Sequence, residues 1–238
     1  RKLKQHNLRH VCEEVSKIKL NSLEPDLSSS FMEALYFPNE GHVDPLSFQK
    51  AFVEKIIPQC DECHFNTEVL DIGPHKIETN KGHYSFDYVI DCRGLGAKKD
   101  LGSLRGVRGE VIKVQAPGVK ISRPVRLMHP RYQIYIVPKP KDCYLIGATS
   151  LESEDFSPVS VRSALELLSA LYSLNSSFSE ARILEMNVQC RPAFTNNNPK
   201  IIFSKGGGLI RVNGLYRHGY LISPKLAEVL LDRMIGNL

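Results

Sequence analysis

Residues 88–96 have the sequence YVIDCRGLG, an apolar run that ends in two glycines. A run of this kind is typical of a buried parallel strand whose carboxyl end opens onto a ligand crevice. Residues 200–203 and 209–212 are two further short apolar runs, and they flank the glycines at 206–208. Helical patterns precede the first run and follow the last. The pattern therefore predicts an α/β module.

The middle of the chain is richer in strand signals. Residues 109–115 alternate as a strand does, residues 135–138 and 144–148 form a hairpin signal, and residues 182–191 predict another strand. A helix is predicted between them at 157–174. We therefore expect an α/β (α+β) fold in which a β-rich insert, residues 101–190, interrupts the α/β module.

The remaining elements are placed by their start and stop signals. They are a helix over 8–20, a loop over 22–30, a strand over 34–38 with a turn at 39–41, a helix from Asp44 and Pro45 to Pro58, a strand over 69–72, a hairpin over 76–88, and a C-terminal helix from Ser223 and Pro224 to Gly236. Three of the predicted helices have an apolar face. In the helix that begins at Asp44 the face is Leu46, Phe48, Phe52, Val53, Ile56 and Ile57. In the helix at 157–174 it is Val161, Ala164, Leu165, Leu168 and Leu171, and in the C-terminal helix it is Leu226, Val229, Leu230 and Met234.

Composition excludes some classes of function. The 238 residues include 31 basic and 26 acidic side chains, for a formal net charge of +5, and no block of like charges indicates a nucleic-acid arm. No apolar run approaches the ~18 residues that a membrane span needs, and no signal peptide is visible after the basic start. We expect a cytoplasmic protein without nucleic-acid or membrane partners.

Six cysteines are too few for a disulfide scaffold. Cys92 and Cys190 lie in apolar runs, so we expect buried, reduced thiols there. Cys60 and Cys63 form a C-x-x-C motif beside His64, which could be half a zinc site, a redox pair, or a polar helix end that leads into a strand. Because no second metal-ligand motif accompanies it, we expect no metal.

Two single residues are candidates for a binding site. Arg191 closes an apolar strand and precedes Pro192, and arginine can bind a carboxylate through two parallel hydrogen bonds. A surface arginine at a strand end explains the same pattern, and the spacing favours that alternative. Tyr135 alternates with apolar neighbours, so it is either a half-buried core tyrosine or a hydroxyl donor in a pocket.

A third candidate is the segment 212–224, VNGLYRHGYLISP, which joins a strand to a helix. Gly214 and Gly219 would let the backbone approach a ligand closely. The N-terminus of the following helix would place its partial positive charge near that ligand. A plain strand-to-helix turn with two exposed basic residues is the alternative.

Six strings taken in order carry a family resemblance: ALYFPNEGHVDP, DYVIDCRGLGA, LRGVRGEVIKV, YIVPKPKDCYLIGATS, CRPAFTNNNP and VNGLYRHGYLISP. Over residues 31–238 the chain resembles the D-amino-acid oxidase and glycine oxidase family of FAD enzymes, closest to the glycine oxidases of bacterial thiamine biosynthesis. The family's opening strand with its GxGxxG turn is not present. The resemblance therefore implies a truncated FAD-binding Rossmann-like domain with an inserted antiparallel substrate domain.

The resemblance also implies domain limits: a helical segment of the FAD domain (1–30), a strand of the substrate domain (31–40), FAD-binding parts (41–100 and 191–238) and the substrate domain (101–190). The implied substrate contacts are Arg191, Tyr135 and Arg217. The implied cofactor contacts are Val69, Cys92, Arg93, Gly94, Gly214, Leu215, Tyr216, Arg217, His218, Gly219, Tyr220 and Leu221. Arg93 departs from the small residue that the family usually has there.

The reaction that the resemblance implies is FAD-dependent oxidative deamination of a small amino acid, glycine, with oxygen reduced to hydrogen peroxide. No protein base is required if the amine arrives neutral, so no catalytic side chain is assigned. Alternatives are a dehydrogenase that passes electrons to a quinone, an oxidase of sarcosine or a D-amino acid, and a fragment without FAD and without catalysis. Because the GxGxxG segment is missing, we expect this chain alone to lack FAD and activity. A homo-oligomer is consistent with the family.

Overall fold

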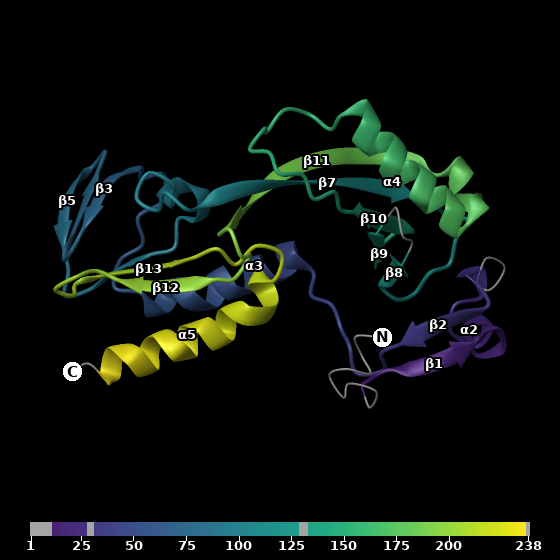
Figure 1. Ribbon diagram of the computed structural model, residues 1–238, viewed down its shortest axis with the longest axis horizontal. Helices are drawn as coiled ribbons and strands as arrows, with labels where there is room; N and C mark the ends of the chain where they lie inside the picture. Colours follow the sequence, from purple (N-terminus) through teal and green to yellow (C-terminus); the bar gives the residue numbers. More distant parts are fainter. Residues whose placement is uncertain (1–10, 28–30, 129–132, 237–238) are drawn as a thin grey trace. The chain divides into compact units, whose positions relative to one another are not determined.

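The computed structural model describes residues 11–27, 31–128 and 133–236, which form two compact units (Figure 1). Unit 1 comprises Arg1–Val53, Gly109–Ser150 and Ser157–Val188, and unit 2 comprises Glu54–Arg108, Leu151–Phe156 and Gln189–Leu238. The mixture of helices with antiparallel sheets confirms the predicted α+β class. The assignment of particular stretches to a cofactor domain and a substrate domain stays a prediction.

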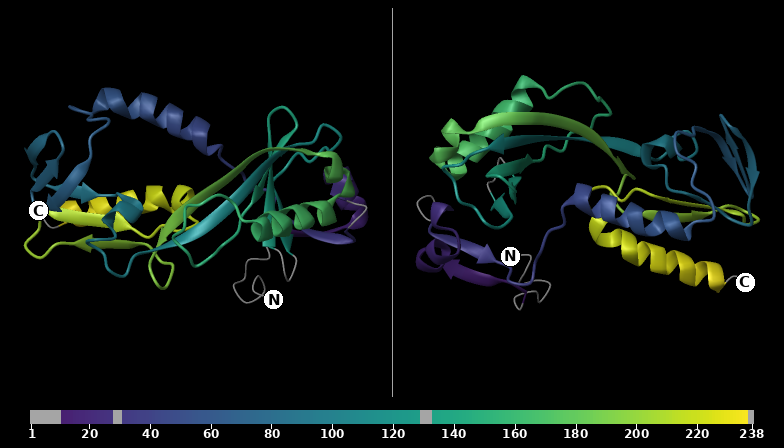
Figure 2. Two further views of the ribbon diagram at one scale, coloured as in Figure 1. Left: turned by 90° about the horizontal axis from the view of Figure 1, so that it is seen from above. Right: turned by 180° about the vertical axis from the view of Figure 1, so that it is seen from behind.

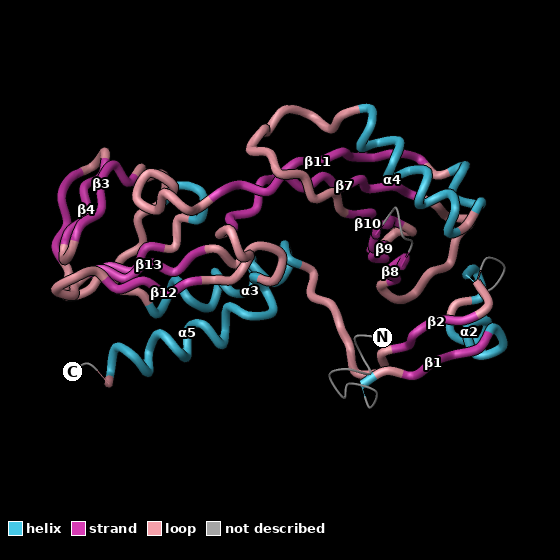
Figure 3. Tube along the Cα trace, in the orientation of Figure 1, coloured by secondary structure: helices cyan, strands magenta, loops and turns pink. Residues whose placement is uncertain are grey.

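The largest sheet has the strand order β11-β7-β10-β9-β8. Its strands are β7 (Arg105–Gln115), β8 (Val125–Met128), β9 (Gln133–Lys139), β10 (Cys143–Gly147) and β11 (Arg182–Ala193). The β9–β10 hairpin is antiparallel, as the sequence predicts, and β10 also pairs antiparallel with β7. Helix α4 (Val161–Leu174) lies along this sheet (Figure 3). The helix and the sheet share a hydrophobic core that includes Ile112, Ile136, Ile146, Leu167 and Leu171.

The buried face of α4 agrees only in part with the predicted one: Ala164, Leu168 and Leu171 pack into the core as expected. Leu167, Ala170 and Leu174 are buried, whereas Val161 and Leu165 are 78% and 61% exposed. Leucines lie on both sides of this helix, so the apolar period alone does not identify the inner face. The predicted start at 157 is also wrong, because the helix begins at Val161.

Ser160 caps the N-terminus of α4, since its side-chain oxygen accepts a hydrogen bond from the N–H of Ser163 (3.1 Å). We expect Ser160→Ala to lower the free energy of unfolding by about 1 kcal/mol, because one amide of the first turn loses its acceptor. Ser160→Thr keeps the acceptor and should remain close to the wild type. Thermal melts followed by circular dichroism measure both variants. Equal losses in the two would show that the cap is not the cause.

The N-terminal prediction was wrong in part. Residues 8–10 of the expected helix, and 28–30 of the expected loop, lie outside the described residues. Among the described residues, Glu13–Ser16 form strand β1, which pairs antiparallel with β2 (Glu33–Tyr36). The helix in this part of the chain, α2, covers only Lys17–Leu23. A 3-10 turn, η2 (Pro25–Leu27), follows it. Val15 is the one buried residue of β1, so cross-strand pairing outweighs local helix propensity there.

Helix α3 (Pro45–Ile56) begins where the sequence predicts, with the side chain of Asp44 accepting from the N–H of Ser47 (2.9 Å). The Asp44 carboxylate also pairs with Lys139. The 3-10 turn η3 (Ile57–Gln59) follows directly. None of the residues of α3 is buried, and Leu46 and Phe52 are 78% and 52% exposed. The predicted apolar face therefore exists but is not covered by the described residues.

Unit 2 contains two three-stranded sheets. One has the order β3-β4-β5, formed by Val69–Gly73, Lys76–Thr79 and Gly82–Ser85, which confirms the predicted hairpin. The other has the order β12-β13-β6, formed by Lys200–Phe203, Leu209–Asn213 and Val89–Asp91. Strands β6 and β13 are parallel, as predicted for the apolar run at 88–92. Val89 is buried but Ile90 is 45% exposed, so the described residues cover only one face of this strand.

Helix α5 (Gly219–Ile235) runs along β12 and β13 (Figures 1 and 2). Leu230 is buried and Leu226, Val229 and Met234 are half-buried, which confirms the predicted inner face. The helix starts earlier than Ser223, so Pro224 lies inside its second turn, where the missing N–H removes one backbone hydrogen bond. Gly236 ends the helix as predicted. In the described part of the chain, no helix combines the length and apolarity needed to span a membrane.

Candidate functional site

The turn between β13 and α5 is fixed by Asn213, which is buried. Its Nδ2 donates to the carbonyl oxygen of Gly94 (2.8 Å), and its Oδ1 accepts from the N–H of Gly214 (2.8 Å). One side chain thus holds both its own turn and the short η4 segment (Gly94–Ala97) that follows β6.

Gly214 has a φ of +79°, and a Cβ atom placed on it would lie 2.3 Å from the ring of Phe194. Packing against Phe194 therefore requires glycine at this position, and the close approach of a ligand to its backbone stays a prediction. Gly219 differs, because the closest atoms to a Cβ there are 3.8 Å away on Leu215. The backbone at 219 is the more accessible of the two.

The end of β11 approaches the same turn. Arg191 is half-buried, and the carbonyl oxygen of its neighbour Pro192 accepts a hydrogen bond from the N–H of Tyr216 (3.0 Å). A Cβ on Gly94 would lie 3.7 Å from the Pro192 ring. Unit 2 therefore brings together three stretches predicted to form a site: 92–94, 190–194 and 213–218.

The N-terminus of α5 has no side-chain cap. His218 occupies the N-cap position and makes no side-chain hydrogen bond to the first turn. Arg217 and His218 are exposed, whereas Tyr216 is half-buried with a φ of +51°. A helix of this length with an uncapped N-terminus attracts anionic groups, because its first amides point outward and its dipole is positive there.

The side chain of Arg93 is occupied by the protein's own carboxylates. Its Nε and one terminal nitrogen donate to the two oxygens of Asp91 (both 2.9 Å), and it also reaches Asp100 (2.6 Å). Burial opposes ionisation of Asp91. Hydrogen bonds from Arg93 and the charge of Arg211 outweigh that effect and hold the pKa of Asp91 below its usual value. The segment 92–94 therefore offers backbone groups, rather than a guanidinium, to any ligand.

The prediction of two buried thiols is half right. Cys190 is buried, and its thiol points to the carbonyl oxygens of Ser153 and Asp155 (3.8 and 3.7 Å). Cys92 is exposed, because it follows the last residue of β6 rather than lying inside the strand. The apolar run alone does not show where the strand ends.

Two further predicted site residues belong to strands β9 and β3. Tyr135 belongs to β9 in unit 1, is half-buried, and faces Gly147 of β10; a Cβ on that glycine would lie 2.5 Å from the tyrosine hydroxyl. The glycine therefore makes room for the tyrosine. Val69 begins β3 in unit 2, opposite Thr79.

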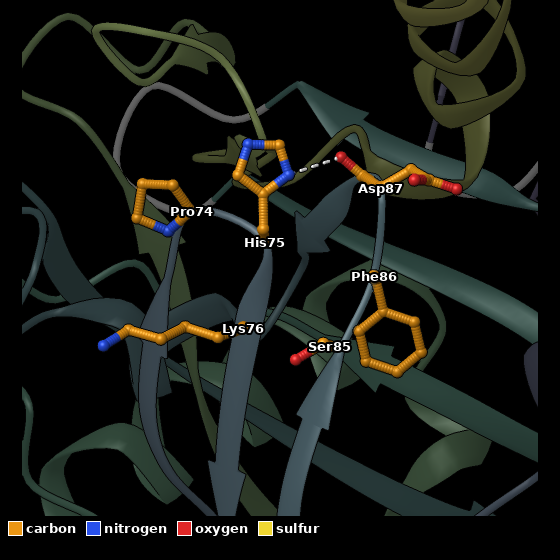
Figure 4. A pocket seen from close by; sticks show the side chains of 6 residues that line it. All are labelled: Pro74, His75, Lys76, Ser85, Phe86 and Asp87. Atoms are coloured by element: carbon orange, nitrogen blue, oxygen red, sulfur yellow. Dashed lines mark hydrogen bonds between the residues drawn. The ribbon is translucent and has the colours of Figure 1, made fainter.

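An open hollow of about 510 Å³ lies in unit 2 against the β4–β5 hairpin, and the sequence did not indicate it (Figure 4). His75 stands at its centre in a left-handed conformation, with Nδ1 2.9 Å from the carbonyl oxygen of Asp87. Pro74, Lys76 and Phe86 also line it. The hollow is shallow, and the three converging stretches do not contribute to it.

The sequence did not indicate that Asp91, Glu110 and Asn213 are buried polar residues. Asp91 was treated as part of an apolar run, although a carboxylate in a strand with an arginine two residues later signals a buried pair. Glu110 is fully buried and accepts from the hydroxyl of Thr149 (2.9 Å). Asn213 was placed in a loop, and nothing in its local sequence indicates that it reaches Gly94.

Comparison with known proteins defines the class. Residues 1–233 match the family described as DAO, FAD dependent oxidoreductase, and the chain belongs to this family of flavin-dependent oxidoreductases. It is 38% identical over 221 residues to a Rhizobium etli protein that carries the name thiamine biosynthesis oxidoreductase ThiO, covering 93% of this chain and 64% of that protein. It is 28% identical over 222 residues to the glycine oxidase of Geobacillus kaustophilus, covering 88% of this chain and 58% of that protein.

Solved structures agree with the fold. The glycine oxidase structure from Geobacillus kaustophilus matches with a TM-score of 0.81 at 26% identity, over 93% of this chain and 62% of that one. The glycine oxidase structure from Bacillus cereus matches with a TM-score of 0.87 at 24% identity, over 99% of this chain and 69% of that one, and it supports the fold alone. The chain spans about three fifths of the length of the curated relatives that it matches.

Proposed function

We propose that the protein catalyses FAD-dependent oxidation of a small amino acid, glycine, with release of hydrogen peroxide, as a step of thiamine biosynthesis. Membership of the flavin-dependent family supports the oxidoreductase class. The names of the relatives in Rhizobium etli and Geobacillus kaustophilus support thiamine biosynthesis and glycine as the particular pathway and substrate.

The convergence of the three stretches in unit 2 carries this proposal. The hydrogen bonds from Asn213 to Gly94 and from Tyr216 to Pro192 hold the turn before α5 next to the strand end that bears Arg191. A half-buried arginine close to an uncapped helix N-terminus is a suitable environment for a small anionic substrate. Arg191 is the proposed carboxylate ligand, and Arg217 is the proposed second basic residue.

The residues of this unit fit part of a flavin site. The backbone at Gly219 can be approached closely, and no side chain caps the first turn of α5. The stretch from Gly214 to Leu221, together with Cys92, Arg93 and Gly94, would hold FAD, and Val69 is proposed as a further contact. We propose that this chain alone does not retain FAD.

FAD, held by the stretch from Gly214 to Leu221, would supply the acceptor for the two electrons removed from the substrate, with oxygen as the final acceptor. Arg191 would orient the substrate by holding its carboxylate, so that the α-carbon is presented in one direction. The amides at the start of α5 would stabilise negative charge that develops next to them. Tyr135 is proposed, separately, to donate its hydroxyl to the substrate. No side chain is assigned as a general base.

Peroxide release tests the reaction. The full-length protein that carries this chain, supplied with FAD and glycine under air, should release peroxide in proportion to glycine consumed. Reduction of a quinone or dye without peroxide would favour the dehydrogenase. Turnover of sarcosine or a D-amino acid in preference to glycine would change the substrate. The absence of any flavin absorbance after reconstitution would favour a protein without the cofactor.

Arg191→Ala should weaken the apparent affinity for glycine by roughly ten- to a hundredfold, because one charge-assisted hydrogen-bonded pair is lost. Steady-state kinetics with glycine measure this. Arg182→Ala is the matched control, because Arg182 begins the same strand and is exposed; its kinetics should not change. An unchanged affinity for glycine in the Arg191 variant would remove this arginine from the substrate site.

A further inference from the structure

Four charged side chains form a cluster at the carboxyl ends of the parallel strands β6 and β13. Arg93 binds Asp91 through two hydrogen bonds (both 2.9 Å) and Asp100 through a third (2.6 Å). Arg211 lies opposite Asp91 on β13, 3.5 Å from its carboxylate and 3.8 Å from that of Asp100. Each arginine therefore pairs with both carboxylates, and the charges within the cluster balance.

Asp100 is the member of this cluster that lies beyond the loop after β6. It follows η4, and its backbone N–H donates to the carbonyl oxygen of Ala97 (3.0 Å). Ala97 is fully buried in the same hydrophobic core as Phe194, so the end of η4 is anchored. The bond between Asp100 and Arg93 therefore ties the start of the loop to an anchored point at its end.

The composition of the cluster decides what it can contribute to a ligand. A guanidinium that is not already paired is a good ligand for phosphate, so Arg93 by itself would attract the pyrophosphate of FAD. Here both carboxylates occupy its side chain, and the segment 92–94 offers backbone groups instead. A contact made by backbone groups depends on the conformation of the loop, because a ligand binds more weakly when binding must also order the segment.

We propose that Asp100 is a positioning residue for the cofactor: through Arg93 it holds the backbone of residues 92–94 in the conformation that receives FAD. The inference rests on the proposed function, which supplies the contact between this segment and FAD. It assigns the arginine a role in shaping the loop and not in neutralising the phosphates. These two roles predict opposite effects when the Asp100 carboxylate is removed.

Asp100→Ala removes the carboxylate at a position where the side chain is 31% exposed. In the full-length protein that carries this chain, we expect FAD to bind roughly tenfold more weakly, because a charge-assisted hydrogen bond no longer holds the loop. Titration of the apoprotein with FAD, followed by quenching of flavin fluorescence, measures the dissociation constant. Asp100→Glu keeps the carboxylate, and its affinity for FAD should lie between those of Asp100→Ala and the wild type.

Two further measurements separate positioning from general support of the fold. A residue that only supports the fold would lower the melting temperature of the apoprotein without changing the rise that a fixed FAD concentration causes. Asp100→Ala should reduce that rise, because stabilisation by a ligand follows its affinity. In hydrogen exchange of the apoprotein, the amides of residues 92–97 should exchange faster in Asp100→Ala than in the wild type. Glu228→Ala is the matched control, because it removes an exposed pair with Lys225 on α5, and it should change neither measurement.

The outcomes distinguish this inference from the function on which it rests. Unchanged FAD affinity in Asp100→Ala overturns the positioning role. Tighter binding also overturns it, since the released Arg93 would then bind the phosphates directly. Both results leave the proposed function intact, because the wild type still binds FAD. A wild-type protein that binds no FAD after reconstitution overturns the proposed function and this inference together.

Discussion

Gly214→Ala should lower the free energy of unfolding by about 3 kcal/mol, one of the two largest losses expected for this protein. The residue has a φ of +79°, which a non-glycine side chain adopts at a cost of about 1 kcal/mol or more. In addition, the new methyl group would lie 2.3 Å from the ring of Phe194. Phe194 is fully buried against Ala97, Leu101 and Leu104, so its ring has little room to move, and overpacking costs about 1–3 kcal/mol.

Gly206→Ala is the matched control, because Gly206 also has a positive φ (+87°) but no atom within 4 Å of its would-be Cβ. It should lose only the backbone contribution, about 1 kcal/mol. The chain contains no tryptophan, so urea unfolding is followed by circular dichroism. Equal losses in the two variants would show that contact with Phe194 does not determine the identity of residue 214.

A second comparison isolates that contact. In a Phe194→Val background the ring is absent, so Gly214→Ala should cost no more than Gly206→Ala does. Residues in contact show such non-additivity, whereas distant residues do not. A full 3 kcal/mol loss in the absence of the ring would place the strain in the backbone of the turn instead.

The sequence was most informative where hydrophobic period and turn chemistry agree. The hairpin around Asn80 and Lys81, the β9–β10 hairpin, and the parallel strand at 89–91 were all predicted, because alternation and turn residues are local signals. Strand β1 was missed because its pairing with β2 is not encoded in its own four residues. The buried face of α4 was predicted in part: Ala164, Leu168 and Leu171 pack into the core as expected, but Val161 and Leu165 are exposed, because leucines occupy both sides of the helix.

The candidate site was likewise predictable only in part. Arg191 and the turn at 213–218 could be singled out from residue type and position, but their proximity depends on the hydrogen bond from Tyr216 to Pro192, which joins distant parts of the chain. The contact of Asn213 with Gly94 spans 119 residues and leaves no local pattern. Gly214 was singled out because a ligand could approach its backbone, and the structure adds that the Phe194 ring leaves no room for a Cβ atom there.

Helix α3 shows the limit of amphipathic patterns. Its apolar face was predicted from spacing, and its N-cap at Asp44 is confirmed, yet Leu46 and Phe48 remain exposed. A periodic pattern predicts which side chains form the apolar face of a helix, but it does not show whether another part of the protein covers that face. Burial has to be observed.

Asp91→Ala should also lower the free energy of unfolding by about 3 kcal/mol. The side chain of Asp91 has no exposed surface and forms ion pairs with Arg93 and Arg211 (2.9 and 3.5 Å). Removing one partner of a buried pair costs about 3–5 kcal/mol, because the other charge stays desolvated without compensation. The lower limit is expected, since Arg93 keeps its bond to Asp100 and both arginines are partly exposed.

The same pair makes stability depend on pH. The pKa of Asp91 is held below its usual value in the folded protein, so its contribution is fully present above the unfolded pKa of about 3.9 and is lost as the pH falls through the folded pKa. Unfolding curves between neutral and acidic pH should therefore decline less steeply below about pH 4 in Asp91→Asn than in the wild type. Identical acid profiles would show that Asp91 is not held ionised by its arginines.

A double-mutant cycle shows where the loss originates. Nε of Arg211 is buried and has no hydrogen-bond partner in the described part of the chain, and the nearest carboxylates to this arginine are Asp91 (3.5 Å) and Asp100 (3.8 Å). Removing Arg211 in the Asp91→Ala background should therefore cost less than removing it from the wild type, or should restore stability. Additive losses would mean that the carboxylate acts through Arg93 alone. Glu166→Ala, which removes an exposed i,i+4 pair with Arg162, should leave stability nearly unchanged and sets the baseline for charge removal.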